Sequence, residues 1–135
     1  METTLAIVKP DGVKRGLIGE ILKRYENKGL RLKAAKVITP TIDLLEKHYE
    51  EHKGKPYYEL LIQYMSSGPV FAMILEGENA VKIVRLLNGA TKVEEALPGT
   101  IRGDFAYSTT FNIIHGSDSI ESAKREIALW FPEIA

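Results

Sequence analysis

The chain has 135 residues, 44% of them hydrophobic, so it is long enough to bury a core and is expected to form one domain over residues 1–135. Eighteen basic residues balance eighteen acidic ones, so no overall charge attracts nucleic acid or an anionic membrane. The chain lacks cysteine, which excludes disulfides and thiolate metal sites and suits a reducing cytoplasm. It shows neither a secretion signal nor an apolar run near the ~18 residues of a membrane span. We therefore expect a cytoplasmic protein without a membrane partner or a specific nucleic-acid partner.

The first part of the chain predicts a strand, a helix and a second strand. Residues 4–8 are a β-prone apolar run, and the following Lys9 precedes a Pro-Asp-Gly turn at 10–12. Apolar residues then recur at helical spacing over 13–25. Apolar and charged residues alternate near the start of 30–38, which predicts another strand. Lys9 is therefore expected at the end of a strand.

The second part predicts more helices and two further strands. In chain order we expect short helices at about 41–52 and from Pro56, a strand at 70–75, a helix capped by Asn79 that ends at Asn88-Gly89, an irregular stretch at 90–104, a last strand within 105–115, and a helix that ends near Phe131. This order predicts an α+β protein, an α/β sandwich of ferredoxin-like βαββαβ type with a four-stranded antiparallel sheet and additional helices. Such a fold alone indicates no function.

His115 is the candidate reactive residue. The stretch 112–119 reads Asn-Ile-Ile-His-Gly-Ser-Asp-Ser, so two β-branched residues lead into the histidine, and a glycine and a polar cluster open a helix. A neutral imidazole is a competent nucleophile near neutral pH. A lone histidine in a turn is more often structural, so the hypothesis depends on what else converges there.

The final helix offers a partner for that histidine. An acidic variant of the capping box begins at Asp118, and an apolar stripe follows at helical spacing. At about 100° per residue, Glu126 lies at the edge of this stripe, whereas Lys124 and Arg125 face outward. An inward Glu126 could orient His115 and favour its charged form. A solvated glutamate at the border is an equally frequent outcome of this spacing.

No P-loop and no dinucleotide fingerprint is present, so a phosphate site would need side-chain cations. Residues 48–52 do fit the inverted zinc-protease pattern His-x-x-Glu-His, which places His48 and His52 on one helix face. A zinc hydrolase is therefore an alternative. It would need a third ligand and an enclosed cleft, and the lysines around this segment indicate a solvated helix instead.

Four stretches together resemble the nucleoside diphosphate kinase family: Lys9–Val13, Gly68–Val70, Pro98–Phe105 and Asn112–Ser119. The resemblance extends from Thr4 to Phe131 in the family's order and spacing, and so implies a single domain of this kind. It implies a kinase that moves the γ-phosphate of a nucleoside triphosphate such as ATP to a nucleoside diphosphate such as GDP. The transfer would be ping-pong, through a phosphohistidine. A non-catalytic, regulatory nucleotide-binding module is the second alternative.

The resemblance also implies roles for individual residues. His115 would be the phosphorylated nucleophile, positioned by Glu126 and Ser117; Lys9, Arg85, Arg102, Thr91 and Asn112 would hold the phosphates and sugar; Tyr49 would line the site; and Tyr57 would stack on the base, where the family commonly has phenylalanine. Three cations would replace a P-loop in neutralising phosphate charge. Stacking on an aromatic ring would tolerate different bases. Mg²⁺ would be carried by the nucleotide phosphates rather than by a protein cage.

Two departures from the family concern its assembly. Lys92-Val93 stands where the family usually has Asn-Pro, in a loop that commonly helps to build subunit contacts. The chain also stops at Ala135, before the longer C-terminal segment of many relatives. The resemblance implies a homo-oligomer, and the two departures leave tetramer and hexamer open.

Overall fold

The computed structural model describes residues 1–134 and contains a four-stranded sheet in the order β2-β3-β1-β4. The strands are β1 (Glu2–Val8), β2 (Arg31–Ile38), β3 (Val70–Gly77) and β4 (Ile114–Gly116). Every neighbouring pair is antiparallel. The predicted α+β class and the four-stranded antiparallel sheet are confirmed.

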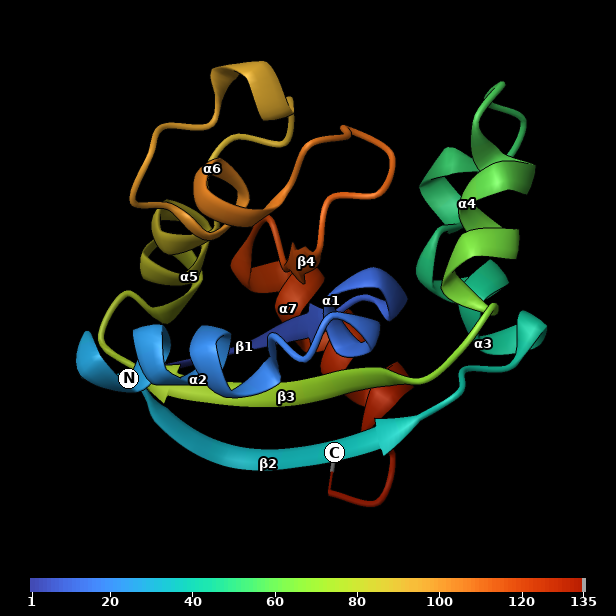
Figure 1. The fold of residues 1–135 in the computed structure, drawn as a ribbon. Helices are drawn as coiled ribbons and strands as arrows, with labels where there is room; N and C mark the ends of the chain where they lie inside the picture. The colour runs from blue at the N-terminus through green and yellow to red at the C-terminus, as the bar shows by residue number, and fades with distance from the viewer. Residues whose placement is uncertain (135) are drawn as a thin grey trace.

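Helices connect and cover these strands (Figure 1). They are α1 (Pro10–Lys14), α2 (Ile18–Asn27), α3 (Ile42–His48), α4 (Tyr58–Met65), α5 (Ala80–Asn88), α6 (Ile101–Phe105) and α7 (Ile120–Trp130), with short 3₁₀ turns η1 (Glu50–His52) and η2 (Val93–Glu95). Within residues 1–134, no helix combines the length and apolar character needed to cross a membrane.

Strand β1 is buried on both faces, because successive side chains of a strand point to opposite sides of the sheet. Leu5 and Ile7 pack into one core with residues of α3, α4 and α7. Ala6 and Val8 pack into a second core with residues of α2 and α5. The central strand is therefore held by two layers of helices, and its C-terminal end is a rigid place from which to present Lys9.

Strand β4 lies beside this rigid end, since Ile7 pairs with His115 and Val8 with Ile114. Ile114 belongs to the core on the α5 side, so the alternation along the strand turns His115 toward α7. Figure 1 shows β4 between the segment that carries η2 and α6 and the hairpin of α3 and α4. Residues far apart in the sequence thus surround His115.

Several local predictions were wrong. The Pro-Asp-Gly turn begins a short helix, α1, and the stretch expected to be irregular contains η2 and the start of α6. The last strand is only three residues long, because residues 106–113 run as a loop toward the site. Asn79 precedes α5 in a left-handed conformation and makes no side-chain cap, and Ser119 rather than Asp118 caps α7 by accepting from the Ser122 N–H.

Gly103 in α6 tests how tightly the segment around Arg102 is packed. Gly103→Ala is expected to lower the free energy of unfolding by about 1–3 kcal/mol, because a Cβ there would lie 1.9 Å from the Leu97 carbonyl oxygen. Gly19→Ala is the matched control: it lies in α2 with nothing near its Cβ, and should raise this free energy by about 0.5–1 kcal/mol. Denaturant titration measures both, and a shift of the same sign in the two variants would contradict the packing argument.

Candidate active site

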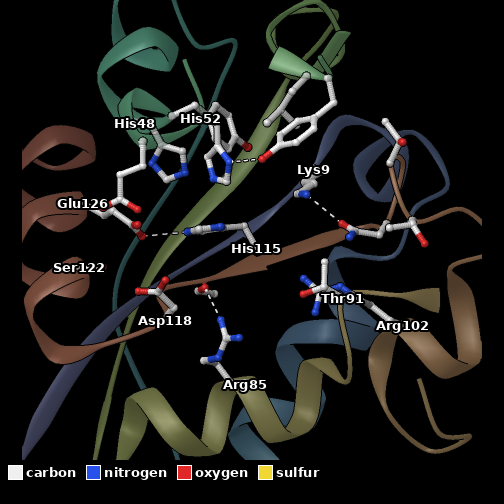
Figure 2. Close-up of a pocket in the computed structure, with 18 of the residues that line it drawn as sticks. Lys9, His48, His52, Arg85, Thr91, Arg102, His115, Asp118, Ser122 and Glu126 are labelled. Carbon is white, nitrogen blue, oxygen red and sulfur yellow. Dashed lines mark hydrogen bonds and ion pairs between the residues drawn. The ribbon is translucent and has the colours of Figure 1, made fainter. Parts of the chain in front are cut away.

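A cavity of about 630 Å³ opens between the α3–α4 hairpin and the segment around α6. Nine of the ten residues assigned to the site from the sequence line it: Lys9, Tyr49, Tyr57, Arg85, Thr91, Arg102, Asn112, His115 and Glu126. The tenth, Ser117, is fully buried and contacts Glu126 from behind. Figure 2 shows His115 between Glu126 on one side and Lys9 and Arg102 on the other. The fold therefore gathers these residues from most of the length of the chain.

A short hydrogen-bond chain holds His115. Its Nε2 lies 2.8 Å from Oε1 of Glu126, and the Ser117 hydroxyl donates to the same oxygen at 2.7 Å. The predicted inward position of Glu126 is confirmed, since this residue is only 5% exposed. Ser117 is itself fixed by its backbone N–H, which donates to the Leu5 carbonyl. Oε1 of the carboxylate is thus held by two donors in the absence of a ligand.

The charge of Glu126 determines the proton position on His115. Burial by itself raises the pKa of Glu126, but its contacts with His115, His48 and Ser117 outweigh burial and leave the pKa below its usual value. Glu126 is therefore a carboxylate at neutral pH and can only accept hydrogen bonds. Nε2 of His115 must then carry the proton. Nδ1 keeps its lone pair and has no hydrogen-bond partner within residues 1–134.

The backbone before His115 is strained. Ile113 has φ of +78°, which β-branched residues rarely adopt, and the Ile114 N–H donates to the Asn112 carbonyl across it at 2.8 Å. The Ile113 carbonyl in turn accepts from the Lys9 N–H at 2.7 Å. This tight turn brings Asn112 and His115 to one cavity. Two β-branched residues in a row predict an extended strand, so no sequence signal indicated the turn.

Lys9 and Asn112 form the wall opposite Glu126. The Lys9 ammonium donates to Oδ1 of Asn112 at 2.8 Å, and Lys9 is only 7% exposed. Burial, followed by the positive charge of Arg102, lowers the pKa of Lys9 to about 7, although Asp11 opposes the shift. Lys9 is consequently poised to gain a proton when an anion approaches.

Two guanidinium groups complete the positive part of the cavity. Arg102 donates to the carbonyls of Gly89 at 2.7 Å and Ile114 at 2.6 Å. Burial lowers the pKa of Arg102 to about 10, so it stays charged at neutral pH. Arg85 is exposed and lies 3.4 Å from the Gly116 carbonyl. The arrangement concentrates positive charge where the described cavity has room for a phosphate chain.

Aromatic groups line the side of the α3–α4 hairpin. The Tyr49 hydroxyl is buried without a hydrogen-bond partner in the described part of the chain, and burial raises the pKa of Tyr49. Tyr57 is 44% exposed just before α4, and its hydroxyl lies 2.5 Å from Nδ1 of His52. Thr91 lies across the cavity on the segment after α5. The site therefore combines a buried hydroxyl that has no partner in residues 1–134 with an accessible aromatic ring.

Two expectations about the rim of this cavity were wrong. His48 is not on a solvated helix but is 5% exposed, because α7 packs against the end of α3 and covers it. Arg125 does not face outward: it lines the cavity and donates to the carbonyls of Lys47 and His48 at the end of α3. The first expectation came from the lysines around the segment and the second from the spacing along one helix. Neither signal shows where another helix packs.

The hypothesis of a zinc site on His48 and His52 is not supported by their positions. In residues 1–134, the group of three potential ligands whose atoms lie within 4.8 Å is His48, His115 and Glu126. His52 is outside this group, and its Nδ1 contacts the Tyr57 hydroxyl. The two histidines of the protease-like pattern therefore do not converge on one metal position.

Comparison with known proteins agrees with the geometry. A model of the family described as nucleoside diphosphate kinase matches residues 2–135. A protein of that name from Thermoanaerobacter pseudethanolicus is 96% identical over 135 residues, covering 100% of both chains. Another of that name, from an Exiguobacterium species, is 56% identical and covers 100% of this chain and 97% of its own.

Solved structures of related proteins also resemble the chain. A nucleoside diphosphate kinase family protein from Babesia bovis superposes with a TM-score of 0.95 and 58% identity, covering 98% of this chain and 90% of its own. A halophilic nucleoside diphosphate kinase from Halobacterium salinarum, solved in complex with CDP, gives a TM-score of 0.94 and 48% identity, covering 96% of this chain and 87% of its own. The chain therefore belongs to the nucleoside diphosphate kinase family of nucleotide phosphotransferases.

Proposed function

We propose that the enzyme moves the γ-phosphate of a nucleoside triphosphate, typically ATP, to a nucleoside diphosphate by a ping-pong mechanism through phosphorylated His115. The observation that carries this proposal is the hydrogen-bond chain from Ser117 through Glu126 to Nε2 of His115. It fixes the imidazole and leaves Nδ1 with a free lone pair beside a cluster of cations. The CDP bound by the Halobacterium relative supports a nucleotide as the ligand.

In the first half-reaction, Nδ1 of His115 attacks the γ-phosphorus. The nitrogen–phosphorus bond forms while the bond from phosphorus to the bridging oxygen breaks, and the diphosphate leaves with that electron pair. The imidazole gains positive charge, which the Glu126 carboxylate stabilises through the Nε2 proton. A second nucleoside diphosphate attacks the phosphorus in the reverse sense, which restores neutral His115.

The residues around His115 would hold the nucleotide. We assign Lys9, Arg85 and Arg102 to the phosphates, Thr91 and Asn112 to the sugar and phosphates, Tyr57 to the base, and the unpaired Tyr49 hydroxyl to the transferring group. Cations and hydroxyls that meet one phosphoryl group neutralise the charge that it carries during transfer.

Mg²⁺ would enter as part of the substrate, bound to the nucleotide phosphates. The cavity walls suit such a complex, since they supply mainly cations on the phosphate side and Asp118 as a nearby carboxylate. The group of His48, His115 and Glu126 does not suit this ion, because Mg²⁺ prefers oxygen ligands in an octahedral arrangement.

We also propose a homo-oligomer, tetramer or hexamer, in a cytoplasmic location. Strand β2 lies at an edge of the sheet, and its Val37 side chain is 58% exposed. Leu97 and Tyr107, in the segments around α6, are 71% and 86% exposed. An open edge and large exposed apolar side chains are typical of surfaces that another subunit covers.

Covalent labelling tests the central step. Incubation with γ-labelled ATP and no acceptor should give an acid-labile phosphate on the protein, which added GDP removes as GTP. His115→Ala should abolish this label, and Ser117→Ala should retain it, because the nucleophile is lost only in the first variant. An acid-stable label, or a label that persists on His115→Ala, would refute the phosphohistidine.

Steady-state kinetics test the cation assignment. Arg102→Ala is expected to lower kcat/KM by about 10²–10³-fold, because a buried donor would no longer meet the transferring charge. Lys124→Ala is the control, since Lys124 is exposed on α7 and does not line the cavity. Arg102 also binds two backbone carbonyls, so thermal unfolding of both variants must be compared. Equal kinetic losses in two folded variants would remove Arg102 from the site.

Calorimetry tests the charge state of Lys9. Near about pH 8 most of the free enzyme has neutral Lys9, so phosphate binding, which favours the ammonium, should take up about one proton. At about pH 6 Lys9 is already charged and the uptake should disappear. ADP titrated in buffers of different ionisation enthalpy measures this quantity, and Lys9→Met should abolish its pH dependence. Uptake that does not change between the two pH values would contradict the argument.

A further inference from the structure

Trp130 and His48 form a buried hydrogen bond behind the nucleophile. The indole Nε1 lies 3.0 Å from Nδ1 of His48, and the two residues are 1% and 5% exposed. An indole nitrogen can only donate, so Nδ1 of His48 must accept and cannot carry a proton. A neutral His48 consequently carries its proton on Nε2. Trp130 itself does not line the cavity, and its side-chain hydrogen bond goes to His48, which does.

His48 lies directly against the reacting groups. Its ring meets that of His115 edge to face, with centroids 4.7 Å apart, and one atom from each of His48, His115 and Glu126 lies within 4.8 Å of the others. The titratable or charged groups around it are His115 on β4, Glu126 and Arg125 on α7, Lys9 after β1, and the neighbouring Tyr49. Burial, then the charge of His115, lowers the pKa of His48 well below its usual value, and Glu126 only partly opposes this.

The same hydrogen bond argues against a metal on His48, His115 and Glu126. A histidine that binds a metal through one nitrogen normally donates the proton of the other nitrogen to an acceptor. The other nitrogen of His48 is instead occupied by the Trp130 N–H. Metal binding would need either a ring flip that breaks this bond or an imidazolate. His48 therefore serves the site as an uncharged ring.

We propose that Trp130 locks His48 as the neutral Nε2–H tautomer, and that this keeps a second positive ring away from the Glu126 carboxylate that holds His115 during phosphoryl transfer. The inference rests on the proposed function. It makes His48 a positioning residue, which neither gives nor takes a proton in the reaction. Nδ1 of His115 forms the bond to phosphorus and the diphosphate leaves with the electron pair, so positive charge grows on the His115 ring. A charged His48 would repel that ring and compete for Glu126.

Trp130→Phe removes the N–H and keeps an aromatic ring. Without that donor, protonation of His48 becomes easier, so its charged form appears at higher pH. The acid limb of the single-turnover phosphorylation rate should move upward by about one pH unit, a loss of about tenfold on that limb, with KM for the nucleotide little changed. Phe131→Leu is the control: it perturbs the same core without a hydrogen bond, and should lower stability without moving the limb.

A double variant assigns the shift to His48. Asn at this position never becomes charged, so His48→Asn in the Trp130→Phe background should return the limb to its original position. A shift that persists in the double variant, or an equal shift in Phe131→Leu, would overturn the proposal and leave Trp130 with a packing role.

Nitrogen NMR reads the tautomer without any need for activity. The chain has three histidines, so a ¹⁵N-histidine spectrum is simple to assign with His48→Asn and His52→Asn as references. The proposal requires an unprotonated Nδ1 and a protonated Nε2 on His48 at neutral pH; a protonated Nδ1 would overturn it. Failure of the wild-type enzyme to label with ATP would instead refute the proposed function, whatever the tautomer.

Discussion

The structure depends on one buried carboxylate. Glu126 accepts hydrogen bonds from both His115 and Ser117, and these contacts join α7 to β4 and to the segment that follows it. Removing one partner of a buried charge typically destabilises a protein by about 3–5 kcal/mol, because the remaining charge is left uncompensated. The same contacts place the proton on Nε2 of His115. Stability and reactivity therefore share one set of hydrogen bonds, which restricts what can vary at these three positions.

The rigid sheet supports a strained backbone conformation close to this carboxylate. Ile113, at φ of +78°, occupies a conformation that costs about 1–3 kcal/mol for such a residue. Its side chain is fully buried in one core, and its carbonyl accepts from the Lys9 N–H. Packing on β1 and β4 offsets the strain, and the turn brings Asn112 to the Lys9 ammonium. The positions of Lys9 and Asn112 in the cavity wall thus depend on the packing of the strands beside them.

The cavity keeps several positively charged side chains close together although they repel one another. Burial is the main cause of the lowered pKa of both Lys9 and Arg102. The charge of Arg102 lowers the pKa of Lys9 further, and the charge of Arg85 that of Arg102, so the free enzyme keeps like charges at close range. Backbone carbonyls of Gly89 and Ile114 partly compensate Arg102. An entering phosphate chain would relieve the remaining repulsion, which is how side chains from three separate segments can take the place of a phosphate-binding loop.

Local patterns in the sequence determined the class of fold and placed Glu126 at the edge of an apolar stripe, because helical and strand periodicity report which side of an element is apolar. They could not show that β4 would be only three residues long or that Ile113 would adopt positive φ, since both follow from pairing with β1 and from Lys9. Nor could they show that His48 is buried. Its environment is made by Trp130 and Arg125, which lie about eighty residues away and approach only when α7 packs against α3. The charge state of the site depends on contacts between elements, and the apolar spacing within one element does not report such contacts.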